Sequence, residues 1–285
     1  MSDSILKFDG VSYRYPDGTR ALDSCSLTIG RGSRTAVLGA NGAGKTTMFL
    51  HLNGILRPSA GQVYWNETPL DYSRGGMRKL RSQVGLVFQN PDSQLFSASV
   101  REDVSFGPMN LRLEEAVVRK RVEEALLAVG MAESADKPVH NLSYGQKKRV
   151  CIAGVLAMQP EVVVLDEPMA GLDAAMQEEL TVVLERLHAS GMTIIIATHD
   201  LDFAYGWADE AVVLQSGRLL AHGKPAEILL QEDVQDTLGA TPLVAEIISS
   251  LSLIGIDLRD KGYLPRSKSE LLKAITAQTR RENKP

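Results

Sequence analysis

Residues 39–46 read Gly-Ala-Asn-Gly-Ala-Gly-Lys-Thr and are the most informative part of the sequence. It fits the pattern G-x-x-x-x-G-K-[ST], in which glycines let backbone N–H groups turn inward around phosphate oxygens. An apolar run at 35–38 reads as a buried strand before it, and a helical stretch from 45 to 52 follows it. Lys45 then suits the charge of β- and γ-phosphates, and the Thr46 hydroxyl suits a magnesium ion. The pattern predicts a phosphate-binding loop and disfavours both a plain glycine-rich turn and a G-x-G-x-x-G dinucleotide site.

A second motif closes another apolar run. Residues 162–167 read Val-Val-Val-Leu-Asp-Glu, and neighbouring strand residues point to opposite faces. If the strand stops at Asp166, Glu167 starts a loop and can point at the nucleotide. Asp166 is then expected to hold magnesium through its water shell, and Glu167 to act as the general base that polarises the attacking water. An ordinary acidic loop is the alternative, and the phosphate-binding loop disfavours it.

Strand and helix patterns alternate along the chain, which indicates an α/β core. Further buried parallel strands are expected at 84–88, 162–165 and 193–197, with a helical insertion over 99–158. Antiparallel strands are predicted within 5–29, an edge strand at 62–65 and a hairpin over 211–221. Beyond Pro225 the pattern is helical again, and the polar residues 278–285 are expected to fray.

Composition limits the class of protein. The chain has 285 residues, 44% of them apolar, and a net charge of -4, so it is a globular chain without the basic excess of a nucleic-acid binder. The longest apolar run, 150–158, has nine residues, whereas a membrane span needs about 20. The N-terminus lacks the pattern of a signal peptide, and the two cysteines, Cys25 and Cys151, are expected to be reduced.

A third motif makes the chain resemble a known family. Residues 142–146 read Leu-Ser-Tyr-Gly-Gln, and Ser143 and Gln146 form an S-x-x-Q capping box ahead of a helix expected at 147–158. A plain helix cap is the alternative. The stretch lies about 100 residues after the phosphate loop and about 20 before the carboxylate pair. In this order it resembles the signature of ATP-binding cassette (ABC) ATPases, in which the third position is more often glycine.

The resemblance extends from Tyr15 through about residue 225 and implies roles for other residues. Gln89 resembles the glutamine that senses magnesium and the transmembrane partner, and His199 the histidine that contacts the γ-phosphate. Residues 171–173, Gly-Leu-Asp, resemble the loop that crosses the dimer interface. Tyr15 resembles the aromatic that stacks on adenine, with Tyr13 as rival and strand packing as the alternative.

The site residues implied by the motifs and the resemblance form three sets. The catalytic residues are Glu167, His199 and Gln89. The ligands of magnesium are Thr46, Gln89 and Asp166. The residues that bind ATP, the last three of them across a dimer, are Tyr15, Gly39, Asn41, Gly42, Gly44, Lys45, Thr46, Thr47, Asp166, Ser143, Gly145 and Gln146. Met169 departs from the threonine usual in the family, and we expect a tuned rate with activity retained.

The family also implies the architecture. It has a P-loop NTPase core of the ABC type with an antiparallel β subdomain, a helical subdomain inserted at about 90–158 and a short C-terminal helical extension. We expect the ATPase domain to cover 1–225 and the extension 226–285. The apolar spacing of the extension suits either dimer contacts or packing on its own domain.

Two stretches narrow the resemblance. Residues 85–96 and 145–156 are similar to those of the ATPases of energy-coupling factor (ECF) transporters. Residues 56–58, residues 70–73 and the short tail resemble the CbiO subunit of cobalt importers. Nickel and vitamin importers are the alternatives. The family implies an ATP hydrolase that powers import without touching the transported metal, in agreement with five histidines that lack ligand spacing.

The implied partners follow from this family. Two cassettes pack head to tail as a homodimer on the cytoplasmic face of a bacterial membrane. They act with a CbiQ-like scaffold, CbiM- and CbiN-like substrate-binding subunits and no nucleic acid. The segment 90–96, with Pro91, Leu95 and Phe96, is expected to form the groove for scaffold helices. A soluble ABC ATPase of ribosomes or DNA repair is disfavoured because the chain has one cassette and no sustained heptads. A non-hydrolysing ATP-binding module is disfavoured because the catalytic residues are present.

Overall fold

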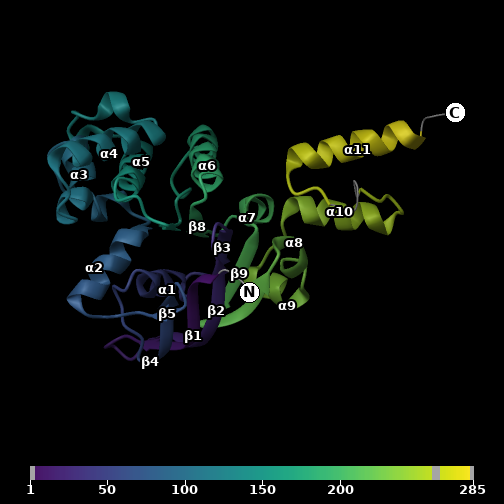
Figure 1. The fold of residues 1–285 in the computed structure, drawn as a ribbon. Coiled ribbons are helices and arrows are strands. Elements are labelled where there is room, and N and C mark those ends of the chain that lie inside the picture. The colour runs from purple at the N-terminus through teal and green to yellow at the C-terminus, as the bar shows by residue number, and fades with distance from the viewer. Residues whose placement is uncertain (1–3, 259–263, 283–285) are drawn as a thin grey trace.

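The computed structural model describes residues 4–258 and 264–282. Its centre is a six-stranded sheet in the order β10-β9-β3-β8-β7-β6 (Figure 1). Neighbours from β9 to β6 pair in parallel, and β10 pairs antiparallel with β9. The strands are β3 (Arg34–Leu38), β6 (Val84–Val87), β7 (Val162–Asp166), β8 (Thr193–Ala197), β9 (Glu210–Gln215) and β10 (Arg218–Gly223). This confirms the predicted parallel strands and the C-terminal hairpin.

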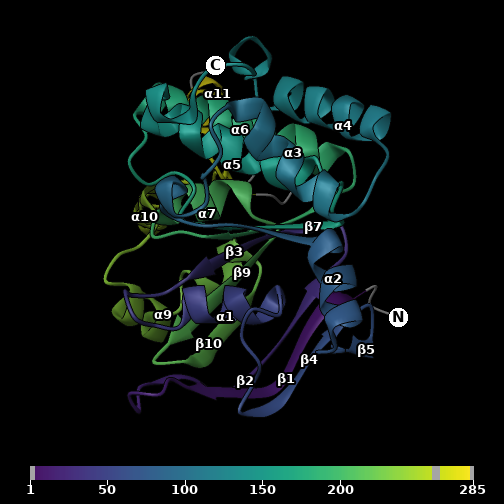
Figure 2. The ribbon, with the colours of Figure 1, turned by 90° about the vertical axis from the view of Figure 1, so that its left-hand side faces the viewer.

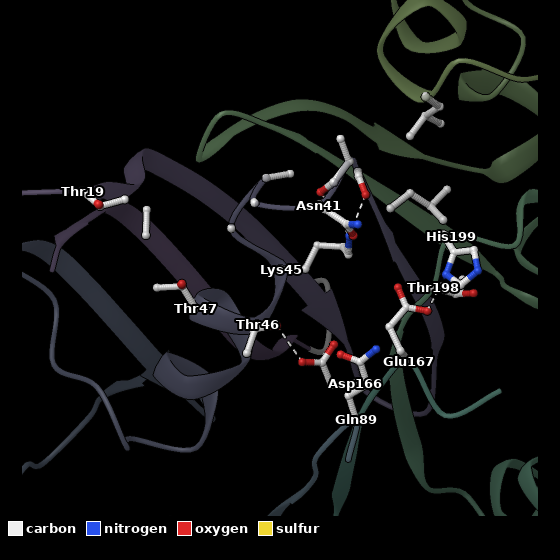
Figure 3. Close-up of a pocket in the computed structure, with 18 of the residues that line it drawn as sticks. Thr19, Asn41, Lys45, Thr46, Thr47, Gln89, Asp166, Glu167, Thr198 and His199 are labelled. Carbon is white, nitrogen blue, oxygen red and sulfur yellow. Dashed lines mark hydrogen bonds and ion pairs between the residues drawn. The ribbon is translucent and has the colours of Figure 1, made fainter. Parts of the chain in front are cut away.

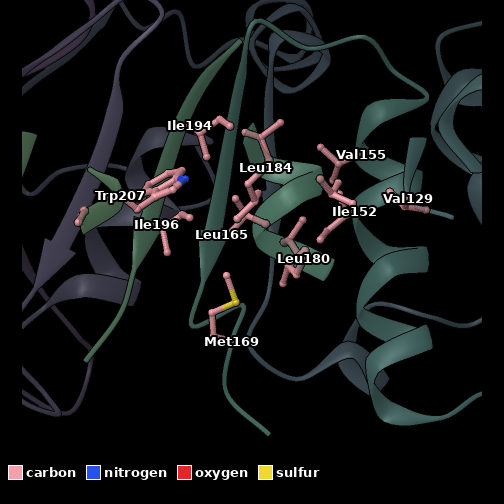
Figure 4. Packing of buried hydrophobic residues seen from close by; sticks show 14 of the residues in the cluster. Val129, Ile152, Val155, Leu165, Met169, Leu180, Leu184, Ile194, Ile196 and Trp207 are labelled. Carbon is pink, nitrogen blue, oxygen red and sulfur yellow. The ribbon is translucent and has the colours of Figure 1, made fainter. Parts of the chain in front are cut away.

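The central strands are largely apolar and almost fully buried because both faces of the sheet are covered. Val163 and Leu165 of β7 pack in one hydrophobic cluster, and Val162 and Val164 pack in the other. This alternation is the geometry expected of a strand buried on both sides. Figure 4 shows the first cluster, which fills the space between the sheet and the helices beside it. Met169, two residues after Glu167, is buried in this cluster.

A second sheet, of four antiparallel strands, lies on the far side of α1 (Lys45–Leu52) from the central sheet (Figure 2). Its order is β2-β1-β4-β5, with β1 (Ser4–Arg14), β2 (Arg20–Gly30), β4 (Ala60–Trp65) and β5 (Thr68–Pro69). The apolar side chains of α1 are buried in the cluster shared by both sheets. The prediction of an edge strand at 62–65 is wrong, because the two-residue strand β5 pairs outside β4. A strand this short leaves little sequence signal.

The predicted helical insertion is confirmed. It contains the 3-10 turn η1 (Pro91–Ser93) and the helices α3 (Val100–Asn110), α4 (Glu115–Ala128) and α5 (Tyr144–Leu156), with the turns η2 (Ala132–Ser134) and η3 (Val139–Asn141) between α4 and α5. The helix α2 (Arg74–Gln83) precedes β6, and α6 (Ala174–Ala189) joins β7 to β8. Helix α5 begins at Tyr144, three residues before the expected start, because Ser143 caps it.

The C-terminal part packs on its own domain. It contains α8 (Pro225–Ile228), α9 (Glu232–Leu238), α10 (Leu243–Leu253) and α11 (Lys268–Glu282), after α7 (Leu201–Trp207). Val244, Ala245 and Ile248 of α10 are buried in the main cluster. The guanidinium of Arg266 donates to the backbone oxygens of Tyr205 and Ala208 at the end of α7. These contacts support packing of the extension on its own domain.

The helix α11 extends through residue 282, and the expectation that residues 278–285 fray stays a prediction. Residues 283–285 lie outside the described residues. Across 4–258 and 264–282, none of the helices has the length and apolarity that crossing a bilayer requires. The thiols of Cys25 and Cys151 are free, and each lies in a different buried cluster.

Candidate nucleotide site

A cavity of about 650 Å³ opens where β3, β7 and β8 end and α1 begins (Figure 3). This is the carboxyl edge of a parallel sheet, where α/β folds place their ligands. The cavity collects most of the predicted site residues from separate parts of the chain. It is lined by Tyr15, Thr19, Arg20, Ala21, Leu38, residues 39–47, Gln89, Asp166, Glu167, Thr198, His199, Leu201 and Leu238.

The phosphate-binding loop depends on glycine at two positions. Gly39 and Gly44 have φ of 148° and 109°, a region that L side chains rarely adopt. A Cβ at Gly39 would lie 2.5 Å from the backbone oxygen of Leu214, and one at Gly44 would lie 2.6 Å from that of Ala21. The Lys45 ammonium donates to the oxygen of Gly39 at 2.6 Å. The loop is therefore a close backbone turn with a buried cation against it, as an anion site requires.

Thr46 and Asp166 meet in the cavity although 120 residues separate them. The Thr46 hydroxyl donates to Asp166 Oδ2 at 2.7 Å. Burial raises the pKa of the Asp166 carboxyl, and the Thr46 hydrogen bond acts in the opposite direction. Gln89, at the end of β6, lines the same cavity. Hydroxyl, carboxylate and amide oxygens are ligands that Mg²⁺ prefers, so these three residues fit the ion.

Glu167 starts the loop after β7, as predicted. Its φ of 48° lies in the left-handed region, which costs about 1–3 kcal/mol for a residue other than glycine. Its backbone N–H donates to the oxygen of Ala197 on β8 at 3.0 Å. The turn directs the side chain into the cavity, where Oε2 lies 2.9 Å from His199 Nδ1 (Figure 3). The carboxylate is thus placed to accept a proton from water at the phosphate end of the cavity.

The two candidate tyrosines occupy different places. Tyr15 lines the cavity, and its hydroxyl lies 3.1 Å from Thr47 Oγ1. Tyr13 packs against the second hydrophobic cluster, with its ring edge-to-face on His51 at 5.0 Å. This placement favours Tyr15 over Tyr13 for stacking on a base, which stays a prediction.

Sequence reasoning missed several residues of the cavity. Thr19, Arg20 and Ala21 come from the turn and strand after Tyr15, and Thr198 precedes His199. Their nearness to predicted site residues was the available signal. Leu201 opens α7, two residues after His199, and Leu238 ends α9 in the C-terminal part. Nothing in the sequence links Leu238 to the phosphate-binding loop.

Ser143, Gly145 and Gln146 lie at the start of α5 and do not line this cavity in the part of the chain described. The predicted capping box is confirmed. The backbone N–H of Gln146 donates to Ser143 Oγ at 3.3 Å, and the N–H of Ser143 donates to Gln146 Oε1 at 3.0 Å. Ser143 is exposed, so its helix end is available to a second chain.

A second cavity, of about 940 Å³, lies between α2, α3 and β6. Phe96 lines it with 66% of its surface exposed, and its ring packs edge-to-face on Phe106 at 4.7 Å. The Asp103 carboxylate accepts hydrogen bonds from the backbone N–H groups of Phe96 and Ser97, which fixes this turn. We refer to this cavity as the α2–α3 groove.

The expectation that Leu95 lines the groove with Phe96 is wrong. Leu95 is half-buried and packs against the main hydrophobic cluster, and Pro91 is buried. Consecutive residues of this turn face opposite ways, so only Phe96 of the pair is presented. Its apolar neighbours in the groove, Ile55, Phe106 and Met109, come from other segments of the chain.

Comparisons with known proteins agree with this geometry. Residues 22–170 match the family model described as ABC transporter. The chain is 50% identical over 235 residues to the energy-coupling factor transporter ATP-binding protein EcfA3 of Clostridium perfringens, covering 82% of each protein. It is 45% identical over 280 residues to the cobalt import ATP-binding protein CbiO of Rhodobacter capsulatus, covering 97% of this chain and 99% of that one.

Two solved structures are also similar. CbiO1 from Clostridium perfringens, part of the ABC transporter complex cbiONQ, superposes with a TM-score of 0.75 at 47% identity, covering 88% of this chain and 95% of that one. The ATP-binding cassette MJ0796, in a dimeric post-hydrolysis state bound to ADP and Pi, superposes with a TM-score of 0.71 at 27% identity, covering 78% and 99%.

The fold, the phosphate-binding loop, the strand-end carboxylates and the capped signature helix define an ATP-hydrolysing cassette of the ABC class. The chain belongs to the ABC transporter family and, within it, to the ATP-binding subunits of ECF transporters.

Proposed function

We propose that this chain is the motor of an ECF importer for a transition-metal ion, with cobalt the first candidate. The similarity to a cobalt import ATP-binding protein over almost the full length of both chains carries the proposal. That match covers 97% of this chain and therefore includes most of the tail. Nickel and vitamins are the alternative substrates, because other similar proteins carry only the general ECF name.

The nucleotide is proposed to be ATP with Mg²⁺. Thr46, Gln89 and Asp166 would hold the ion, which neutralises phosphate charge when bound. Lys45 and the loop backbone hold the phosphates, and Tyr15 faces the base. Glu167 takes a proton from the attacking water. His199, whose ring lies beside the Glu167 carboxylate, contacts the γ-phosphate.

The active form is proposed to be a head-to-tail homodimer. The exposed Ser143 at a capped helix end supplies N–H groups suited to an anion, yet this end is outside the cavity of its own chain. A two-fold arrangement lets each signature complete the other chain's site. The dimeric state of MJ0796 is the precedent among similar structures.

The α2–α3 groove is proposed to receive a helix of a CbiQ-like membrane scaffold, which holds the chain as a peripheral subunit on the cytoplasmic face. Four large apolar side chains, Ile55, Phe96, Phe106 and Met109, are exposed together in this one cavity, and such a contiguous apolar patch marks a binding surface. The segment from Gln89 to Phe96 runs directly from the nucleotide cavity to the groove. Opening and closing of the dimer can thus move the scaffold and, through it, CbiM- and CbiN-like subunits.

Transport by a purified complex tests the proposal. The affinity-tagged chain is expressed in its own cells, and the membrane proteins that it retains in mild detergent are identified and reconstituted into vesicles. ATP should drive uptake of radioactive Co²⁺ into vesicles whose cassettes face the ATP, and the Glu167→Gln complex should not. If ATP drives uptake of Ni²⁺ or a vitamin but not of Co²⁺, the transported substrate is that ion or vitamin and the cobalt assignment is wrong. Retention of ribosomes or DNA with no membrane protein would overturn the transport function.

A further inference from the structure

Lys148 is a buried lysine that the nucleotide site does not account for. It lies in the second turn of α5 with 3% of its surface exposed. Its ammonium donates to three backbone oxygens of one loop, those of Glu167 at 2.8 Å, Pro168 at 2.9 Å and Ala170 at 2.8 Å. An ammonium has three donors, so the loop satisfies all of them.

A cation at this place needs such partners. Burial lowers the pKa of Lys148 to about 8, while the nearby carboxylates of Glu167 and Asp166 act in the opposite direction. Isolated buried ammonium groups are strongly unfavourable, so an apolar residue would be the ordinary choice for packing alone. The three oxygens explain how the cation is tolerated, and the loop that carries them suggests what it does.

The contacts of Lys148 fix the backbone on one side of Glu167. The other side is fixed by the N–H of Glu167, which donates to the oxygen of Ala197. Between these two anchors the residue keeps a φ of 48°, a conformation that persists only when its surroundings hold it. The direction of the carboxylate in the cavity therefore depends on both anchors.

Tyr144 adds a second contact between the start of α5 and the loops of the nucleotide site. Its ring lies 5.3 Å from the Lys148 ammonium, and its hydroxyl donates to the backbone oxygen of Gln89 at 3.3 Å. The ring also packs on Gly171, where a Cβ would lie 2.9 Å from it. The start of α5 thus contacts both loops that carry predicted catalytic side chains, those of Gln89 and Glu167.

We propose that Lys148 is a positioning residue for ATP hydrolysis, which holds the loop 167–170 so that the Glu167 carboxylate points at the attacking water. Lys148 touches no substrate in this role. The proposal rests on the assignment of Glu167 as the base, and the experiment below separates the two.

Lys148→Met keeps the stem of the side chain and removes the ammonium. The basal kcat of the purified chain should fall at least about tenfold, since a misplaced catalytic group costs about that much or more. The Kd for ATP and the KM should stay within about threefold, because the phosphate-binding loop is untouched. Lys147→Met is the matched control and should change kcat by less than about twofold. Lys147 is the preceding residue, and its ammonium pairs with Asp92 instead.

A double-mutant cycle distinguishes positioning from general damage. Once Glu167→Gln has removed the base, adding Lys148→Met should lower the residual kcat by less than about twofold. The proposal would be overturned if the fold-loss of kcat in the double variant equals the product of the losses in the two single variants. It would also be overturned if Lys148→Met alone leaves kcat unchanged. If Glu167→Gln itself leaves kcat unchanged, the base is misassigned and the proposed mechanism fails first.

Folding is checked by thermal unfolding of each variant with and without ATP. Should Lys148→Met not fold, Lys148→Gln takes its place in the same cycle, since it keeps an N–H donor but loses charge and reach. Its kcat should lie below that of the unmodified chain, with unchanged ATP affinity and no further loss in the Glu167→Gln background. A kcat equal to that of the unmodified chain, or a full multiplication of losses, would overturn the proposal.

Discussion

His199 Nδ1 lies 2.9 Å from Glu167 Oε2, which brings together two residues that are 32 positions apart. The Glu167 side chain is 12% exposed and that of His199 is 76% exposed. The histidine therefore stands on the solvent side of the carboxylate. This contact places the proposed base and the proposed γ-phosphate contact at one corner of the nucleotide cavity.

Glu167→Gln should retain ATP binding and lose turnover. The amide keeps the size and hydrogen bonding of the side chain but cannot take a proton from water, so kcat should fall at least about a hundredfold. Steady-state phosphate release and an ATP-binding titration measure the two properties, and size-exclusion chromatography should detect an ATP-bound dimer that persists. Near-normal turnover would remove Glu167 from the role of base.

Asp166→Asn should stabilise the chain in the absence of nucleotide and magnesium. Because burial raises the pKa of Asp166, the folded state keeps the proton that the unfolded chain loses near pH 3.8. The stabilisation is full below that pH and is lost as pH rises through the folded pKa, so the ionised carboxyl disfavours folding at pH 7. Removing the charge should raise Tm at pH 7 by a few degrees, given that about 1 kcal/mol corresponds to roughly 2–4 °C.

Asp209→Asn provides the contrast for this measurement. Burial acts against ionisation of Asp209 too, but hydrogen bonds from the Arg34 side chain and backbone prevail and lower its pKa. Its substitution should lower Tm at pH 7. With magnesium and ATP added, the unmodified chain should gain stability and Asp166→Asn should gain much less. A lower Tm for Asp166→Asn without ligand would contradict the prediction.

Much of the fold could be predicted because its signals are local. The apolar runs of β7 and β8 and the glycine pattern of 39–46 each determine one element within a few residues. The order of the motifs then indicated the family, and the four residues 143–146 are enough to predict the helix cap at Ser143. The phosphate-binding loop of the cavity could be predicted for the same reason, since consecutive residues form it.

The remainder of the site depends on contacts between distant segments. Leu238 reaches the cavity because α9 lies against β9, where Gln215 donates a hydrogen bond to the Thr237 hydroxyl. Leu95 differs from Phe96 only through the packing of the turn that carries them. In the sequence, Lys148 looks like an ordinary exposed helical lysine. Its burial becomes apparent only in the structure, where the loop after Glu167 covers its ammonium. Such placements have no periodicity or spacing in the sequence.

Mixing two inactive variants tests the head-to-tail dimer. Lys45→Ala damages the phosphate-binding loop and Ser143→Arg blocks the signature, so neither variant alone has an intact site. A hybrid dimer has one site in which both residues are intact. Equal mixing should restore roughly a quarter of the normal number of sites, because about half of the dimers are hybrids. ATPase activity of the mixture measures this recovery.

The control for this experiment is a mixture of Lys45→Ala with the double variant Lys45→Ala/Ser143→Arg. Its hybrids contain no intact site under the head-to-tail arrangement, and activity should stay at the level of the separate variants. Absence of recovery in the test mixture, with both variants folded and hybrids formed, would show that Ser143 does not act on the nucleotide of a second chain.

Phe96→Glu should detach the chain from its membrane partner and spare basal hydrolysis. The ring is largely exposed in the α2–α3 groove, so the isolated domain loses little when it is replaced. Seating such a ring in a partner contributes about 1.5–3 kcal/mol, and losing it should weaken binding by roughly 10- to 150-fold. The measurement is recovery of the membrane scaffold by the tagged chain, beside kcat of the chain alone. Leu127→Glu is the matched control, since Leu127 is 71% exposed on α4 and does not line the groove. Recovery of the scaffold and kcat should both be unchanged in this variant. Loss of basal hydrolysis with the membrane partner retained would mean that Phe96 supports its own domain and that the scaffold binds elsewhere.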